Sequence, residues 1–161
     1  MKEPLTIVVD TREKDSLSFA STPGISVMRK GLKTGDYSLL DYEDSLCFER
    51  KSVQDLVGTL IASHERFLRE MERMRTFEKK YILIEHTPSI VYNYCKAHGW
   101  QHKFDTVIQS LLAYACHYNV RVRFCKDRQD MEKYIVAKTR EFLKEKGEQK
   151  CQKGNDTSSA E

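Results

Sequence analysis

The sequence is organised around residues 35–55, GDYSLLDYEDSLCFERKSVQD, where a strand-turn-strand pattern meets a cluster of charged side chains. Residues 36–40 and 45–51 are strand-like runs, and the polar residues 41–44 between them are typical of a turn. The short turn and the alternation of side-chain types on either side of it predict an antiparallel hairpin.

The register of this hairpin follows if the turn is centred on its middle peptide. Asp36 then lies opposite Glu49, and Tyr37 lies opposite Phe48. Because side chains alternate faces along a strand, the hairpin has one apolar face and one polar face. The apolar face carries Tyr37, Leu39, Leu46 and Phe48, and the polar face carries Asp36, Ser38, Cys47, Glu49 and Lys51.

The polar face is a candidate metal site. Directly opposed residues have Cβ atoms roughly 4.5–5.5 Å apart, so the carboxylates of Asp36 and Glu49 repel each other unless a cation lies between them. Mg²⁺ prefers carboxylate oxygens and water, and Lys51 points to the same side. The alternative is a surface hairpin with mixed charges, and a register slip of one residue would bury both carboxylates.

Composition sets broader limits. The chain has 161 residues, is 40% hydrophobic and carries a net charge of +3, which fits one core and permits a nucleic-acid partner. No apolar run approaches the roughly 18–20 residues of a membrane span, and no signal-peptide pattern opens the chain. Five cysteines without a C-x-x-C motif argue against a disulfide framework. We expect an intracellular, reducing compartment, either the cytoplasm of a microbe or virus-infected cell or a nucleus.

A second group of charged residues follows the first predicted strand. Residues 5–9 form an apolar run typical of a buried strand, and Asp10, Arg12 and Glu13 come directly after it. Asp10 is either a turn former or a third carboxylate near the metal. Arg12 could contact a phosphate, and Glu13 could join the acidic cluster.

Beyond the hairpin, the pattern alternates between helices and strands. Ser52 is a predicted helix cap, so we expect Asp55 to complement the helix N-terminus rather than to bind the metal directly. We expect further helices at residues 64–80, 89–98, 104–118 and 127–146, and strands at 25–28, 81–84 and 120–124, the last at an edge. We interpret residues 1–146 as one domain and the polar residues 147–161 as a disordered tail.

Two further sets of residues are candidates for binding phosphate or zinc. Arg66 and Arg69, near the start of the predicted helix 64–80, are the best candidates there for phosphate contacts, although ion pairs within the helix would also explain its charges. Cys95, His98 and His102 do not make a convincing zinc site, because structural zinc usually needs four closely spaced ligands.

Together these motifs resemble the nuclease domain of XPF-type endonucleases. The matching motifs are DTRE at residues 10–13, GDY at 35–37, ERKSVQD at 49–55, RF at 66–67 and YILIE at 81–85. The resemblance spans roughly residues 5–145 and covers every position of the family's G-D and E-R-K-x-x-x-D signature. It implies an α/β, restriction-endonuclease-like fold, in which a mixed central sheet has helices on both sides.

The resemblance also implies a function and assigns roles. It implies a DNA endonuclease that needs Mg²⁺ or Mn²⁺, uses no small-molecule cofactor and often acts on branched or flapped DNA. The implied catalytic residues are Asp36, Glu49 and Lys51, the implied metal ligands are Asp36 and Glu49 with Asp10 nearby, and the implied supporting residues are Arg12, Glu13, Arg50 and Asp55.

The family pattern leaves two further expectations. Many members carry helix-hairpin-helix modules after the nuclease domain, and we expect this chain to be a stand-alone nuclease domain without them. The last two helices could form a homodimer interface, although core packing explains their apolar residues about as well. The alternative function is a non-catalytic DNA-binding or scaffolding subunit, but inactive members usually have an eroded signature.

Overall fold

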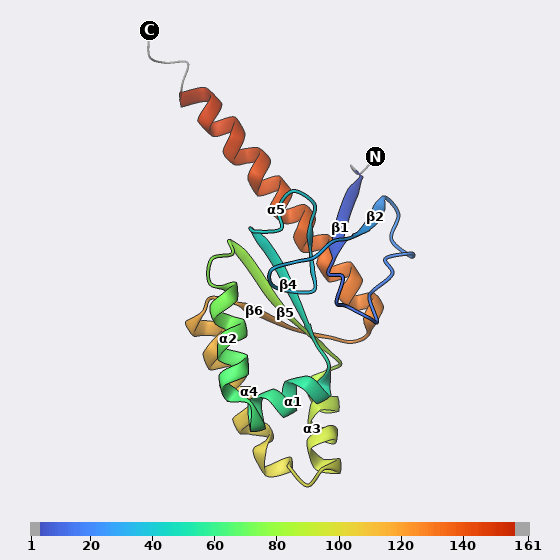
Figure 1. The fold of residues 1–161 in the computed structure, drawn as a ribbon, viewed down its shortest axis with the longest axis vertical. Coiled ribbons are helices and arrows are strands. Elements are labelled where there is room, and N and C mark those ends of the chain that lie inside the picture. Colours follow the sequence, from blue (N-terminus) through green and yellow to red (C-terminus); the bar gives the residue numbers. More distant parts are fainter. Residues whose placement is uncertain (1–3, 157–161) are drawn as a thin grey trace.

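A six-stranded mixed sheet forms the centre of the molecule in the computed structural model, which describes residues 4–156 (Figure 1). The strands are β1 (Leu5–Val9), β2 (Ile25–Arg29), β3 (Tyr37–Leu39), β4 (Leu46–Lys51), β5 (Lys79–Glu85) and β6 (Arg121–Cys125). The helices are α1 (Val53–Ala62), α2 (His64–Met74), α3 (Pro88–Ala97), α4 (Phe104–His117) and α5 (Arg128–Asp156), with a short 3₁₀ helix, η1 (Gln101–Lys103), before α4.

The strand order is β2-β1-β3-β4-β5-β6, and the predicted hairpin occupies its middle. β3 runs antiparallel to both β1 and β4, whereas β1 pairs parallel with β2, and β5 pairs parallel with β4 and β6. Tyr37 is paired with Phe48, and the Asp36 amide donates a hydrogen bond to the Phe48 carbonyl (2.8 Å). The predicted register is therefore confirmed, as is the edge position of the last strand.

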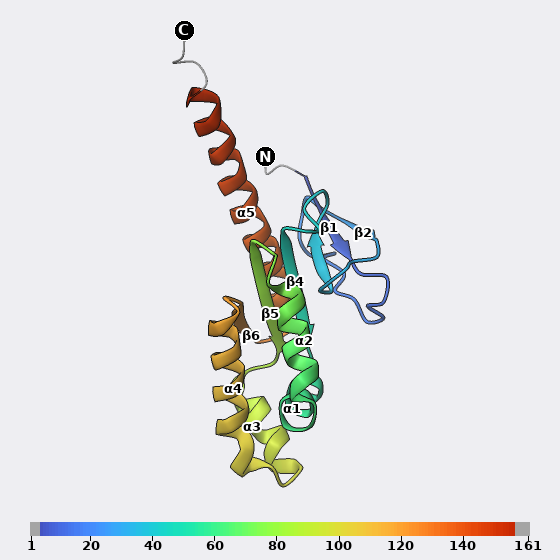
Figure 2. The ribbon, with the colours of Figure 1, turned by 60° about the vertical axis from the view of Figure 1, so that its left-hand side comes forward.

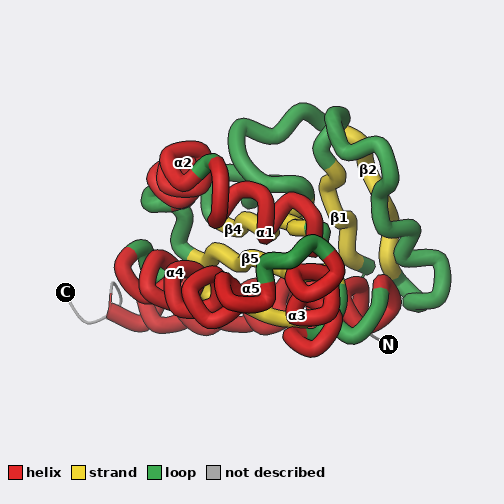
Figure 3. The backbone as a smooth tube through the Cα atoms, turned by 90° about the horizontal axis from the view of Figure 1, so that it is seen from below, coloured by secondary structure: helices red, strands yellow, loops and turns green. Residues whose placement is uncertain are grey.

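Helices cover both faces of the sheet, as expected. On one face α5 packs through Met131, Ile135 and Phe142 against a core that includes Tyr37 and Phe48. On the other face α1 to α4 enclose a second core, which contains Cys47. Figures 2 and 3 show these helices around the strands, with β1 and β2 on the side of the molecule away from α4.

Burial on the second face differs from the expected polar surface. Cys47 is fully buried and only 4% of Lys51 is exposed, because α1 and α2 lie over this side of β4. The charged face of the hairpin is therefore the floor of a partly enclosed site and not a solvated surface.

Two element boundaries also differ from the prediction. The predicted helix 64–80 ends at Met74, because residues 79 and 80 hydrogen bond to β4 as the start of β5. The last helix continues to Asp156, so the prediction of disorder was wrong for residues 147–156, where glutamate, glutamine and lysine are good helix formers. Residues 157–161 lie outside the described part, and the division of the chain at residue 146 stays a prediction.

The long connection between β1 and β2 is held from several sides. The Leu17 amide donates a hydrogen bond to the Tyr37 hydroxyl (2.9 Å), and the amides of Ser18 and Phe19 donate to Glu132 Oε1 on α5 (3.0 and 3.1 Å). Arg128 pairs with Asp15. These bonds fix the segment that carries the charged residues after β1.

The structure also bears on membrane-spanning helices and on the state of the cysteines. Across residues 4–156, no helix combines the length and apolar character that a membrane crossing needs. Cys47, Cys95, Cys116 and Cys125 are free thiols, in line with the expectation that the cysteines do not form a disulfide framework.

Gly35 gives a test of the hairpin geometry. Its φ is +83°, and a Cβ added there would lie 2.5 Å from Cys47 Sγ and 3.1 Å from the Phe48 carbonyl oxygen. We expect Gly35→Ala to lower the free energy of unfolding by about 1–3 kcal/mol, as measured by chemical denaturation, because both the backbone conformation and the contact are unfavourable.

Gly58→Ala is the matched control. Gly58 lies inside α1, and an added Cβ would meet no heavy atom within 4 Å. This substitution should stabilise the protein by roughly 0.5–1 kcal/mol. Equal effects at the two positions would contradict the close approach of Gly35 to β4.

Candidate functional site

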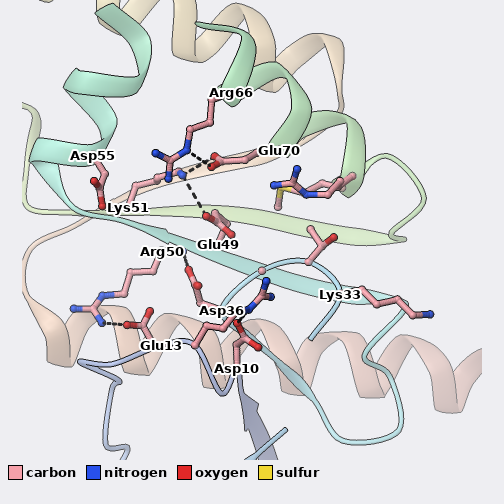
Figure 4. Close-up of a pocket in the computed structure, with 15 residues that line it drawn as sticks. Asp10, Glu13, Lys33, Asp36, Glu49, Arg50, Lys51, Asp55, Arg66 and Glu70 are labelled. Carbon is pink, nitrogen blue, oxygen red and sulfur yellow. Dashed lines mark hydrogen bonds and ion pairs between the residues drawn. The ribbon is translucent and has the colours of Figure 1, made fainter. Parts of the chain in front are cut away.

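A pocket of about 680 Å³ brings most of the predicted residues together (Figure 4). It lies where the carboxyl ends of β1 and β4, the loop before β3, the first turn of α1 and one face of α2 meet. Its lining includes Asp10, Arg12, Glu13, Asp36, Glu49, Arg50, Lys51, Asp55 and Arg66, which sequence analysis singled out, and also Lys33, Glu70 and Arg73, which it did not.

Asp36 and Glu49 come from opposite strands of the hairpin. Asp36 Oδ2 accepts a hydrogen bond from the Arg50 amide (2.8 Å), which fixes its carboxylate beside β4. Burial, followed by the nearby charge of Glu49, raises the pKa of Asp36 to about 7. Burial also raises the pKa of Glu49, although Lys51 acts against it. Burial therefore disfavours the ionised form of both carboxylates.

Lys51 follows Glu49 on the same side of β4, as predicted. Its Nζ lies 3.2 Å from Glu49 Oε1 and 2.5 Å from Glu70 Oε2. Burial acts to lower the pKa of Lys51, but these two carboxylates outweigh it, and the net pKa is raised. The lysine therefore remains an ammonium ion inside the pocket.

Asp10 is only 2% exposed, and hydrogen bonds from the chain engage both of its oxygens. Oδ2 accepts from Arg12 Nε (2.7 Å), and Oδ1 accepts from the Leu32 amide (3.0 Å). Arg12 also donates to the Leu32 carbonyl (2.8 Å). Asp10 and Arg12 thus tie the end of β1 to the loop before β3, and Arg12 remains largely exposed at the pocket rim.

Arg50 and Glu13 lie on the other side of β4 from Lys51. Arg50 Nε donates to Glu85 Oε1 (2.5 Å), and Arg50 Nη1 lies 3.8 Å from Glu13 Oε1. Nη1 also donates to the Asp15 carbonyl. Arg50 therefore anchors the segment after β1 to the ends of β4 and β5, which is consistent with a supporting role.

The start of α1 has the predicted cap. Ser52 Oγ accepts a hydrogen bond from the Asp55 amide (3.1 Å), and Asp55 is the acidic residue of the first turn. The Asp55 side chain is exposed at the edge of the pocket. This placement agrees with the structural role that we expected for it.

The pocket residues on α2 differ from those that the sequence predicted. Arg66 lines the pocket, whereas Arg69 does not and instead pairs with Glu65 (3.7 Å). Glu70 and Arg73 lie on the Arg66 side of the helix, because residues four and seven apart fall on the same face. This spacing from Arg66 is the sequence feature from which Glu70 and Arg73 could have been predicted.

The donor set suits a cation held by two carboxylates. Within residues 4–156, no group of three or more histidine, cysteine, aspartate or glutamate side chains is arranged to hold a metal ion. Asp36 and Glu49 nevertheless form a pair of carboxylates whose pKa values are raised, mainly by burial, and a cation bound between them would favour their ionised forms. Mg²⁺ commonly binds through one or two carboxylates, with waters and substrate phosphate completing its shell. The site therefore fits this ion without Asp10.

Known proteins are similar to this chain in sequence and in fold. A stretch of 86 residues, 52% of this chain, is 37% identical to the DNA repair endonuclease XPF of Mus musculus, but the match spans only 9% of that protein. The structure is similar to XPF from Aeropyrum pernix, with a TM-score of 0.69 at 22% identity over 86% of this chain and 65% of that one. XPF from Aeropyrum pernix in complex with DNA also matches, with a TM-score of 0.69 and 22% identity over 87% of this chain and 66% of that one.

These structural matches confirm the expected restriction-endonuclease-like fold, a mixed sheet with helices on both faces. The model of the ERCC4 domain matches residues 9–137, which include the hairpin, α2 and all of the pocket lining. The chain therefore belongs to the ERCC4 domain family.

Proposed function

We propose that this chain is a metal-dependent DNA endonuclease that hydrolyses phosphodiester bonds in branched, flapped or otherwise structured DNA. The observation that carries the proposal is the juxtaposition of two partly buried carboxylates, Asp36 and Glu49, with the ammonium group of Lys51 in one open pocket. Membership of the ERCC4 domain family and similarity to the DNA repair endonuclease XPF of Mus musculus support it.

Asp36 and Glu49 would hold Mg²⁺ or Mn²⁺. The chemistry supplied by such a cation is Lewis acidity toward a phosphate oxygen and easier deprotonation of the attacking water. Hydrolysis forms one P–O bond to the water oxygen and breaks one to the sugar oxygen, which receives a proton. Lys51, kept charged by its neighbours, can stabilise the negative charge that develops on the phosphate oxygens.

DNA would approach over the basic rim of the pocket. Arg12 and Arg66 have exposed guanidinium groups there, and Lys33 and Arg73 add two more cations. Phosphate contacts of this kind position the backbone without reading sequence, as suits an enzyme that recognises DNA shape. The XPF structure from Aeropyrum pernix in complex with DNA supports DNA as the partner.

Three expectations stay predictions. An intracellular, reducing compartment follows from a DNA substrate and is consistent with the free thiols. The homodimer through the last helices is consistent with the exposed side chain of Leu112 on α4. Arg69, which lies outside the pocket lining, would reach DNA only if the duplex extends along α2.

The cleavage test uses flap, fork and plain duplex DNA with and without Mg²⁺ or Mn²⁺. Asp36→Asn and Glu49→Gln should each reduce the cleavage rate by roughly 10²–10³-fold or more, because each removes a ligand charge from the reacting centre. Rates are measured by gel electrophoresis of end-labelled DNA under single-turnover conditions.

Asp105→Asn is the control, because Asp105 is exposed on the first turn of α4 and does not line the pocket. It should cleave at the wild-type rate. Unchanged cleavage by Asp36→Asn or Glu49→Gln would refute the site. DNA binding without cleavage under any divalent metal would instead favour a non-catalytic subunit.

A second test uses the pH dependence of stability without metal. The pKa of Asp36 is higher in the folded protein than its ordinary value, so the folded state holds this proton more tightly than the unfolded chain. Ionisation of Asp36 therefore destabilises the fold as pH rises from about 4, and the effect levels off above about 7. Asp36→Asn, which cannot ionise, should be more stable than wild type in EDTA at pH 8, with a smaller difference at pH 5.

Chemical denaturation at the two pH values measures the difference, with Asp105→Asn again as the control. Adding Mg²⁺ at pH 8 should stabilise the wild type and leave Asp36→Asn nearly unchanged. A difference that does not vary with pH, or equal stabilisation of both proteins by Mg²⁺, would count against a metal held by Asp36.

A further inference from the structure

Helix α2 places a third carboxylate, that of Glu70, against the buried lysine of the pocket. Glu70 is 8% exposed, and its Oε2 lies 2.5 Å from Lys51 Nζ. Figure 4 shows the Glu70 side chain reaching from α2 toward β4, where it meets Lys51 opposite Glu49. The ammonium group therefore lies between two carboxylates that come from different elements.

Glu49 and Glu70 would have different roles in the reaction. Glu49 is a proposed metal ligand, so its charge would be shared with the cation when the site is loaded. A buried ammonium group without a counter-ion is costly, and it would turn toward any carboxylate within reach. Glu70 is then the carboxylate that holds Lys51 in place in the pocket while Glu49 is engaged.

Glu70 also reaches the rim of the pocket. Its Oε1 lies 3.6 Å from Arg66 Nε, one helical turn earlier on α2, and the Arg66 side chain is 63% exposed. A DNA phosphate that binds Arg66 would compete with Glu70 for it and leave the carboxylate to Lys51. The two ion pairs that join Arg66 to Glu70 and Glu70 to Lys51 thus link a surface cation to the reacting centre.

We infer that Glu70 is a positioning residue, which acts on phosphodiester cleavage through Lys51 and does not bind the metal. This inference rests on the proposed nuclease function and adds to it a residue from α2, outside the hairpin. Glu70 would orient the ammonium group toward the scissile phosphate, and its effect on the reaction would disappear if Lys51 were absent.

Glu70→Gln is the main variant, because glutamine keeps the shape and removes the charge. It should lower kcat for flap DNA by about 10- to 100-fold and change KM by less than about threefold, the usual cost of losing a partner that orients a reacting group. Glu70→Asp keeps the charge and should retain at least about tenfold more activity than Glu70→Gln. Glu65→Gln, an exposed change on the same helix, should have no effect.

A double-mutant cycle with Lys51→Met tests whether Glu70 works through the lysine. In the Lys51→Met background, Glu70→Gln should change the single-turnover rate by less than about twofold. A full 10- to 100-fold loss in that background would show that Glu70 acts independently and would overturn the inference.

Mn²⁺ titration by calorimetry, without DNA, separates positioning from metal binding. The affinity of Glu70→Gln should stay within about threefold of wild type, whereas a loss of more than tenfold would make Glu70 a ligand and overturn the inference. Thermal unfolding checks that the variants are folded. If Glu70→Gln is not folded, Glu70→Asp replaces it in the cleavage and calorimetry experiments. If the wild type itself does not cleave, the proposed function fails; if it cleaves and Glu70→Gln cleaves equally well, only the role of Glu70 fails.

Discussion

The structure depends on holding like charges close together, partly out of water, at the centre of a sheet. Asp36 directly precedes β3, which pairs with the strand that carries Glu49, and burial raises the pKa of both carboxylates. Lys51 offsets part of this charge, but it is shared with Glu70. Ionising both carboxylates in this setting is unfavourable, and the divalent cation that we propose would offset this cost.

The surrounding fold keeps the pocket from relaxing this repulsion. α1 and α2 cover the side of β4 that carries Lys51, and Gly35 lets the chain pass close to Cys47 just before Asp36. The segment after β1 is held by Arg50 on one side and by α5 on the other. These contacts hold the backbone segments that carry both carboxylates.

The local part of this arrangement could be predicted from the sequence. Alternation and turn length were enough to place Tyr37 opposite Phe48, and that pairing brings Asp36 near Glu49 and directs Lys51 to the same side. The role of Ser52 as a cap also followed from local chemistry. These features depend on residues a short distance apart in the chain.

Tertiary contacts account for what the sequence did not reveal. The sequence left Asp10 open as a turn former or a third carboxylate near the metal, and it did not reveal that the fold brings the Leu32 amide to donate a hydrogen bond to one of its oxygens. Glu70 looked like one of many charges on α2, and its partner Lys51 becomes visible only once α2 packs over β4. The helix 64–80 seemed continuous because charged residues run through its end, yet pairing with β4 converts residues 79 and 80 into strand.

The alternation along β4 has a consequence for how such a chain can vary. Arg50 faces the loop after β1, while its neighbours Glu49 and Lys51 face the pocket. One residue inserted before Glu49 would exchange these faces, turning Glu49 away from the pocket and Arg50 toward it. The turn at residues 41–44 lies beyond the paired strands and has no such restriction. Insertions and deletions within this family should therefore occur in the turn at residues 41–44, and β4 should keep a constant length.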